Sequence, residues 1–470
     1  MRAGFALLPL AVLAGCAAPD SPRPDAAAVA PPPDWRSGLA GAAAVDGAWW
    51  DAFRDPALTA LVERSLANNV DIAMAVARVR EARAQESLAR AALFPTLDAS
   101  AGTTHARSVS ALGVASEGSS AQPGVQAAYE VDLFGRIADQ VSAARNAWLA
   151  SAAARDAARL SVASSAASGY ITLLGLDARR RVVLETIVSR AEALRLARSR
   201  ARAGYTSELE LRQAEVEYEG AALILPQVDL AIARQENGLR LLAGDVPGPV
   251  TRGTSLAALV GPPLPDAGLP SDLLRRRPDI AQAELSLAAS DASLSVARKQ
   301  FLPSLRLSAS TGAVFSSGLP DPVTLWSVGG SILAPLFEGG RLRANVEGAA
   351  ARRDQAAFAY RRAALTAFRE VEDALAAVAS LSRQRATAEA QRLAIAQALR
   401  HATNRYQAGY SSYLEQLDAQ RALLSADLAL VQVRADQMTS LVALYQVLGG
   451  GWSGVAEEGA PDRRLQRVTK

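Results

Sequence analysis

The chain has 470 residues, of which 50% are hydrophobic, 5% aromatic and 21% charged. A formal net charge of +3 is close to balance, so the chain lacks the basic excess of a nucleic-acid-binding protein and no nucleic-acid partner is expected. The small aromatic share and the many alanines favour a large helical protein.

The N-terminus has the features of a secretion signal. Residues 1–15 combine an early Arg with an apolar run too short to span a bilayer, as in a signal peptide. The run ends at Leu13-Ala14-Gly15-Cys16, which resembles the bacterial lipobox, whose Cys is lipidated. Cys16 is the only Cys, so it has no disulfide partner within the chain. Residues 16–48 are predicted to be a lipid anchor and tether, since they begin Pro-, Ala- and Asp-rich. Because Ala17 replaces the Asp that retains similar lipoproteins in the inner membrane, sorting to the outer membrane is expected.

An internal repeat divides the chain into two similar halves. Val70-Asp71-Ile72-Ala73 is echoed by Pro278-Asp279-Ile280-Ala281 at an offset of 208, and Ala203-Gly204-Tyr205-Thr206-Ser207 is echoed by Ala408-Gly409-Tyr410-Ser411-Ser412 at an offset of 205. The predicted units are a first repeat at 49–244, a connector at 245–270, a second repeat at 271–453 and a polar tail at 454–470.

Each half is predicted to contain two strands, at about 96–106 and 122–134 in the first and at about 304–316 and 324–337 in the second. Around Val125 the apolar residues take odd positions and polar residues even ones, which is the period of a strand. A long loop over 106–122 is expected between the first two strands. Strands of about ten residues with long loops are typical of membrane barrels. Four strands cannot close, whereas three copies give twelve strands and room for a lumen. A soluble sheet that packs its apolar face on helices is the alternative.

Long helices are predicted after each strand pair, because 136–202 and 341–406 contain no Pro. A helix of about 65 residues is about 100 Å long. Apolar residues between Tyr360 and Leu381 recur in steps of four and three, which is a coiled-coil seam. Helices predicted at 208–242 and 272–301 together match one long helix in length, so two shorter helices stacked end to end are expected beside each long one.

Taken together, these features resemble the TolC/OprM-type outer-membrane factor family, in its NodT-like lipoprotein branch. The resemblance rests on the lipobox, the motif from Trp49 to Leu58, the turns at 133–136 and 336–341, the two Gly-Tyr loops and the internal repeat. The resemblance implies a mainly α fold with a membrane β-barrel portion: four strands per protomer in a trimeric twelve-stranded barrel, continued by a long coiled-coil α-barrel. It further implies a homotrimer in outer-membrane lipid, a periplasmic adaptor and an inner-membrane pump of the RND type.

The resemblance also implies roles for single residues. The tips that would contact the adaptor are Gly204, Tyr205, Thr206, Gly409, Tyr410 and Ser411. The positions matching the family's periplasmic gate are Tyr406, Glu210, Glu415 and Asp418. Helix capping is an open alternative for the acidic ones. Ser411 stands where some relatives carry a latching Arg, so that latch is not expected. The polar strand face would place Gln126, Glu130, Asp132 and Arg306 in the barrel lumen.

No catalytic constellation is recognisable. The two histidines, His105 and His401, are far apart in the sequence, and the chain has no Cys other than Cys16. The sequence also contains no phosphate-binding loop of the form G-x-x-x-x-G-K. We therefore expect neither an enzyme nor a cofactor or metal. The predicted function is the outer-membrane channel of a tripartite efflux system that passively conducts small molecules. The alternatives are the exit duct of a type I protein secretion system and a periplasmic coiled-coil scaffold lipoprotein without a pore.

Overall fold

The computed structural model describes residues 22–38, 41–109 and 113–454. The predicted signal peptide, Cys16 and all but the first residue of the predicted tail lie outside these residues. Among the described residues two compact units occur, the first formed by 22–28, 78–152 and 282–362 and the second by 29–77, 153–281 and 363–454.

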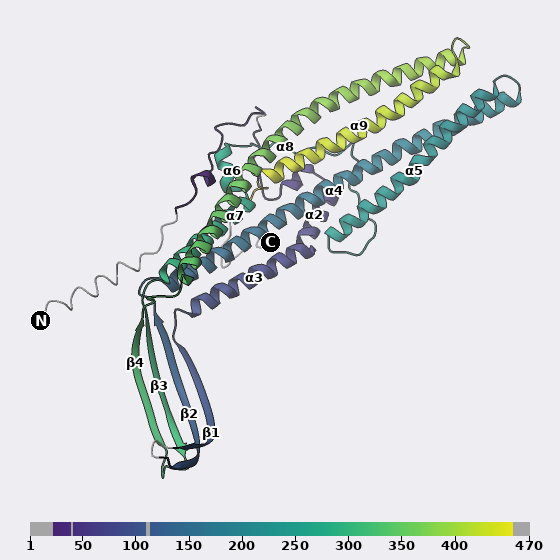
Figure 1. Ribbon diagram of the computed structural model, residues 1–470. Coiled ribbons are helices and arrows are strands. Elements are labelled where there is room, and N and C mark those ends of the chain that lie inside the picture. Colours follow the sequence, from purple (N-terminus) through teal and green to yellow (C-terminus); the bar gives the residue numbers. More distant parts are fainter. Residues whose placement is uncertain (1–21, 39–40, 110–112, 455–470) are drawn as a thin grey trace, which may run out of the picture. The chain divides into compact units, whose positions relative to one another are not determined.

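The helices and strands follow each other in two similar series (Figure 1). The first series is η1 (Asp25–Ala27), η2 (Trp49–Phe53), α2 (Pro56–Asn68), α3 (Val70–Ala91), β1 (Thr96–Val109), β2 (Ala115–Val131), α4 (Arg136–Arg202) and α5 (Glu208–Leu242). The second is α6 (Pro270–Arg276), α7 (Pro278–Lys299), β3 (Ser304–Ser316), β4 (Val323–Leu333), α8 (Arg341–Gln407) and α9 (Tyr413–Val447). Within the described ranges, no helix combines the length and the apolarity needed to cross a membrane.

The four strands form one antiparallel sheet in the order β1-β2-β3-β4. Its register aligns apolar positions in rows, since Leu97 pairs with Ala127, Ala127 with Ala309 and Ala309 with Val328. Directly paired residues project from the same face, so one face is apolar. This face carries Leu97, Val125, Tyr129, Val131, Leu305, Leu307, Phe315, Trp326, Val328 and Ile332. The opposite face carries Asp98, Gln126, Glu130, Arg306, Ser308, Ser310, Ser327 and Ser331.

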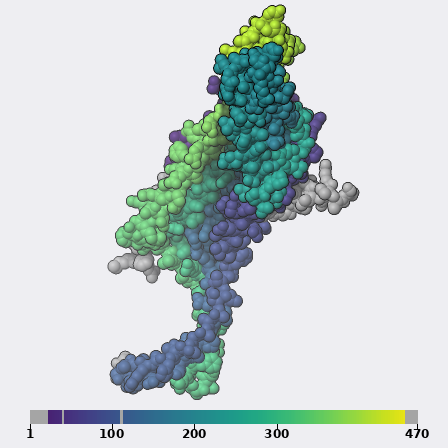
Figure 2. All heavy atoms as spheres, turned by 90° about the vertical axis from the view of Figure 1, so that its right-hand side faces the viewer, coloured from purple at the N-terminus to yellow at the C-terminus, as the bar shows by residue number. Residues whose placement is uncertain are grey.

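No described helix covers either face of the edge strands. Every residue of β1 (blue in Figure 2) and of β4 (green) is exposed, on the apolar face as on the polar one. A soluble sheet would bury its apolar face against helices, and this one does not.

The strands differ in extent from the sequence prediction. The predicted loop over 106–122 is wrong at both ends, because β1 continues to Val109 and β2 starts at Ala115. This stretch is rich in Ser and Gly and lacks apolar alternation, but the strand ladder depends on backbone hydrogen bonds and continues without it. At the other ends, β2 stops at Val131 and β4 at Leu333, short of the predicted 134 and 337.

The long helices are unbroken, with 67 residues each in α4 and α8, whereas the single helix predicted at 272–301 is two helices. The break falls at Arg277, whose backbone is extended at φ −110° and ψ 126°. Pro278 causes it, because a residue before Pro is sterically disfavoured in the helical region. In the first repeat Asn69 separates α2 from α3 with a similar extended backbone.

In the second unit, the segment that carries the Trp49–Leu58 motif is fixed by a buried polar network. Asp55 caps α2 by accepting from the backbone N of Ala57 at 2.9 Å. Its other carboxyl oxygen accepts from Tyr170 Oη at 2.8 Å, and that hydroxyl in turn accepts from Gly253 N at 2.9 Å. Trp49 stacks on Tyr445 with ring centroids 5.6 Å apart. The motif therefore joins three parts of the chain that are distant in sequence.

Part of the predicted tether contacts the helices of the first unit, although most of its described residues up to residue 38 are exposed. Arg353, only 4% exposed, donates to the carbonyl oxygen of Pro22 at 2.8 Å, and Ala27 is buried against Leu287 and Ala357. Composition alone predicted a free segment. Small residues such as Ala nevertheless fit between helices, and a backbone carbonyl can bind a buried Arg whatever its side chain is.

Candidate functional site

The loops 203–207 and 408–412 end the two long helices in the same way. Gly204 and Gly409 have φ of +74° and +80°, and a Cβ on either would meet open space, so backbone conformation rather than crowding requires Gly. The next residue donates its backbone N–H to the helix, Tyr205 to Arg200 O at 2.9 Å and Tyr410 to Arg405 O at 2.8 Å. The exposed fractions of Tyr205 and Tyr410 are 85% and 80%, which leaves two aromatic rings free at the tips.

Thr206 and Ser411 are partly buried within the tips. Thr206 Oγ1 donates to the Glu210 carboxylate, and the buried Ser411 Oγ has no hydrogen-bond partner among the described residues. Ser207 caps α5 by accepting from Glu210 N at 3.3 Å. Because Ser207 caps the helix, the Glu210 carboxylate does not serve as the cap.

Two of the four residues predicted for the gate, Glu210 and Tyr406, are in contact and link the two hairpins. Tyr406 Oη, on α8, donates to Glu210 Oε2, on α5, at 3.2 Å. Arg200 of α4 donates to the same hydroxyl at 3.4 Å, and its guanidinium lies 5.6 Å from the ring centroid. Burial and the nearby Glu210 charge raise the pKa of Tyr406, so it remains a neutral donor at physiological pH. A basic, a phenolic and an acidic side chain thus tie α4, α8 and α5 together.

An apolar cluster and a second polar network lie next to this link. Leu194, Ala214, Tyr413 and Leu417 are buried together, with the Tyr406 ring packed against them. Seven residues after Glu210 on α5, Glu217 forms an ion pair with Arg190 of α4. It forms a second ion pair with Arg421 of α9, whose Nη2 lies 2.6 Å from the carboxylate. Burial lowers the pKa of Arg190. Sequence reasoning missed this network and Arg200.

The other two predicted gate residues do not join Tyr406. Glu415 lies 3.6 Å from Arg405, and Asp418 lies 3.8 Å from Arg421, with 65% of its side chain exposed. Neither acidic group is buried in the chain, so each is available to line an aperture.

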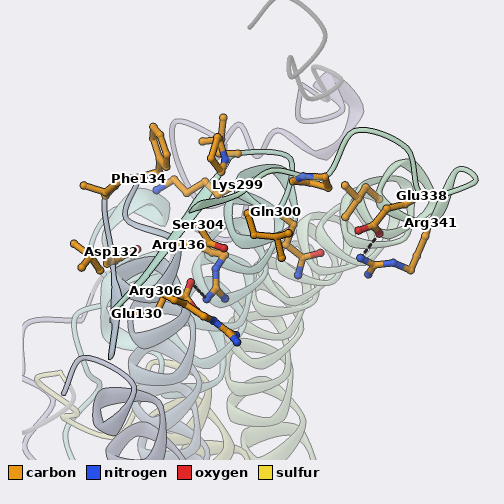
Figure 3. A pocket seen from close by; sticks show the side chains of 17 residues that line it. Glu130, Asp132, Phe134, Arg136, Lys299, Gln300, Ser304, Arg306, Glu338 and Arg341 are labelled. Carbon is orange, nitrogen blue, oxygen red and sulfur yellow. Dashed lines mark hydrogen bonds and ion pairs between the residues drawn. The ribbon is translucent and has the colours of Figure 1, made fainter. Parts of the chain in front are cut away.

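Three of the four polar residues predicted for the lumen, Glu130, Asp132 and Arg306, line a pocket of about 410 Å³ where the sheet meets the helices (Figure 3). Glu130 accepts from Arg136 at 2.6 Å, and Arg306, paired with Glu130 in the register, lies 3.9 Å from it. Asp132 stands beyond β2 and caps α4, accepting from Ala138 N at 2.8 Å. Gln126 lies further along β2, on the polar face opposite Ser310.

The apolar face has the height of a bilayer core. Along β3 it extends from Leu305 to Phe315, and ten steps of about 3.4 Å give about 34 Å, or about 26 Å at a tilt of about 40°. Membrane barrels present an apolar band of about 25 Å.

An open four-stranded sheet with one apolar face, joined to two long helical hairpins with matched tips, defines an outer-membrane channel of the TolC-like fold. The outer membrane efflux protein family model matches residues 61–245 and 269–450, and the chain belongs to this family. It is thus an outer-membrane component of an efflux system, in a family of transport channels rather than enzymes.

Named relatives are similar in sequence to this chain over most of its length. The solvent efflux pump outer membrane protein SrpC of Pseudomonas putida is 36% identical over 413 residues, covering 85% of this chain and 87% of its own. The antibiotic efflux pump outer membrane protein ArpC of Pseudomonas putida is 35% identical over 466 residues, covering 94% of both. The solved outer membrane channel CmeC of Campylobacter jejuni superposes with a TM-score of 0.85 at 27% identity, covering 94% of this chain and 96% of its own.

Proposed function

We propose that three copies of this chain form a closed, gated duct through which small toxic molecules leave the cell. The open sheet carries this proposal. Within the described residues β1 and β4 each pair on one side only, and an unpaired strand edge in lipid costs several kcal/mol per unsatisfied backbone group. Pairing β4 of one copy with β1 of the next removes every edge, and three copies give twelve strands with a polar lumen.

The cargo and partners follow from the relatives and the tips. SrpC and ArpC are named for solvent and antibiotic efflux. A duct of this class does not supply energy, so an inner-membrane pump of the RND type and a periplasmic adaptor complete the system. The exposed Tyr205 and Tyr410, with Gly204, Thr206, Gly409 and Ser411 beside them, form the surface for the adaptor. Cys16 carries the lipid that anchors the protein to the outer membrane.

The gate is the link between Tyr406, Glu210 and Arg200, with Glu415 and Asp418 at the aperture. Three copies bring these carboxylates together and favour cations there. Engagement of the tips by the adaptor separates the α4–α5 hairpin from the α8–α9 hairpin. This movement breaks hydrogen bonds of 3.2 and 3.4 Å at Tyr406 and requires no covalent chemistry.

Single-channel conductance in planar bilayers tests the proposal, with the oligomer mass measured by light scattering. The double variant Tyr406→Phe, Glu210→Gln removes the link, and we expect larger and more frequent openings than in the parent. Glu219→Gln is the matched control, because Glu219 is an exposed α5 carboxylate outside the cluster. A trimer whose conductance is the same in all three proteins would refute the gate, and a monomer that never conducts would refute the duct.

A further inference from the structure

The pocket at the base of the polar sheet face lies within the first unit and has the size of a small-molecule site. Its volume is about 410 Å³, and sites for small molecules span about 300–1,000 Å³. Glu130, Ser304 and Arg306 line it and project from the polar face of β2 and β3, so the pocket adjoins that face (Figure 3). The other charged residues of the lining come from the turns and helix ends beside the sheet: Asp132, Arg136, Lys299, Glu338 and Arg341.

The carboxylates of this pocket all have strong partners within the protein. Glu130 accepts from Arg136 Nη2 at 2.6 Å, and Glu338 is paired with Arg341. Asp132 accepts from two backbone N–H groups at the start of α4, at 3.0 and 2.8 Å. Hydrogen bonds to charged donors and to a helix N-terminus offset the negative charge of a carboxylate. The acidic groups of the lining are therefore already compensated by the protein itself.

Arg306 is the basic residue of the pocket that lacks an equivalent partner. Lys299 Nζ lies 2.6 Å from Asp139 and donates to a backbone carbonyl at 3.1 Å, so it is fully engaged. The carboxylate that Arg306 approaches is Glu130, at 3.9 Å, and this group already holds Arg136. With 72% of its side chain exposed, Arg306 presents its N–H donors to solvent. Because a guanidinium stays charged at physiological pH, the pocket carries one positive charge that its own lining does not compensate.

The neighbours of Arg306 on the polar face are hydroxyl groups rather than charges. Its register partner on β4 is Ser331, and both of its neighbours on that face of β3 are also Ser. Among the described strand residues of this face, Asp98 is the one acidic residue besides Glu130. Asp98 pairs with Gln126, four residues or about 14 Å further along the strands, which exceeds the screening length of about 8–10 Å. A positive charge among hydroxyl donors is suited to an oxyanion.

We propose that this pocket is a binding subsite for the anionic group, a carboxylate, sulfate or phosphate, of a small molecule that passes through the lumen, and that Arg306 binds this group. Arginine suits this role because its planar fork donates two parallel N–H bonds to such oxygens. The proposal rests on the proposed duct and deepens it, because it gives the charge of the solutes that pause inside. Three copies place three such pockets around the base of the barrel, with a sign opposite to that of the acidic aperture.

Sulfate is a suitable probe, because it has the charge of the proposed ligand class and does not titrate near neutral pH. Single-channel chloride current through the full-length protein in phosphatidylcholine bilayers is recorded while sulfate is added on the side of the sheet, so that it reaches the pocket without passing the aperture. Arg306→Gln removes the charge, and Arg306→Lys keeps the charge without the planar fork. Arg107→Gln is the matched control, because it removes the same charge from the apolar face of the same sheet.

We expect sulfate to block the current saturably in the parent and in Arg107→Gln. The half-blocking concentration should be at least about tenfold higher in Arg306→Gln, with an intermediate value in Arg306→Lys. Equal block in the parent and in Arg306→Gln would overturn the subsite, and so would an equal loss of block in both Gln variants, which would indicate a general effect of charge. Block that weakens when phosphatidylglycerol is added to the bilayer would show that a lipid headgroup fills the pocket, and this would also overturn the proposal.

Equilibrium dialysis of labelled sulfate against the detergent-solubilised protein separates the subsite from the duct. Binding that is lost in Arg306→Gln and kept in Arg107→Gln supports the subsite even where no current flows, and the missing current then contradicts the duct alone. A protein that conducts but neither binds sulfate nor is blocked by it retains the duct and refutes the subsite.

Discussion

Replacing Tyr170 by Phe should destabilise the second unit and change its response to alkali. Tyr170 is fully buried, donates to Asp55 at 2.8 Å and accepts from Gly253 N at 2.9 Å. Phe keeps the ring but leaves a buried carboxyl oxygen and a backbone N–H without this partner. Hydrogen bonds to a group of this kind are worth about 1.5–3 kcal/mol, and we expect a loss of about 2 kcal/mol in the free energy of unfolding.

The raised pKa of Tyr170 also predicts how the free energy of unfolding changes with pH. Burial and the bond to Asp55 raise the pKa of Tyr170 from 10.0 to about 12. A group whose pKa is higher in the folded state stabilises fully below its unfolded pKa, and this contribution is lost as the pH rises from about 10 to about 12. A shift of this size corresponds to about 3 kcal/mol. Tyr170→Phe lacks the titrating group, so its stability should fall less steeply over this range.

Denaturant unfolding followed by circular dichroism, at pH 8 and at several values from 9.5 to 12, measures both effects on detergent-solubilised protein. Tyr205→Phe is the matched control, because that ring is 85% exposed at a tip. The reasoning fails if Tyr170→Phe is as stable as the parent at pH 8, or if the two lose stability in parallel above pH 10.

Three further substitutions probe the sheet, the tips and the buried network. Trp326→Arg on the apolar face should cost about 2–4 kcal/mol per protomer in the membrane and reduce heat-modifiable trimers in outer-membrane fractions, whereas Ser327→Arg on the polar face should not. Gly409→Ala, at φ +80°, should lower thermal stability by about 1–2 kcal/mol, while Gly220→Ala within α5 should raise it by about 0.5–1 kcal/mol. Glu217→Gln leaves Arg190 without its carboxylate and should cost about 3 kcal/mol in a melting experiment.

The sequence was most informative where one repeating pattern determines one element. Period-two alternation located β3 within a residue, because apolar and polar side chains alternate between its two faces. The absence of Pro and the repeated Gly-Tyr sequence located both long helices and both tips, since Gly at a helix end is required by backbone geometry. The prediction that Glu210 and Tyr406 belong to a gate came from family resemblance rather than from pattern; the structure shows that the two side chains are hydrogen-bonded, and their role in a gate stays a prediction.

The missed features depend on contacts between distant segments. Pro278 was visible, but the 272–301 stretch looked continuous because its composition is helical on both sides of the break. Arg200 had a detectable signal, since Arg405 repeats it at the offset of 205 that relates the two tips. The contacts of residues 22–28 had no such signal, because they depend on the backbone carbonyl of Pro22 and the methyl group of Ala27, which are common to many sequences.

The two acidic residues that link the hairpins through α5 differ in burial and in their partners, and this difference predicts where the proposed gate would open. Glu210 and Glu217 are seven residues apart, about 10 Å along the helix. Glu210 is held by a phenol and a threonine at the edge of the protein, whereas Glu217 is 8% exposed and paired with two arginines. A hydrogen bond from a tyrosine to a carboxylate is worth about 1.5–3 kcal/mol and less where water can replace the partner, but removing a partner from a buried ion pair costs about 3–5 kcal/mol. In the proposed gate, binding at the tips is therefore expected to break the Glu210 link first, while the Glu217 network holds the hairpins together as the pivot about which the last two turns move apart.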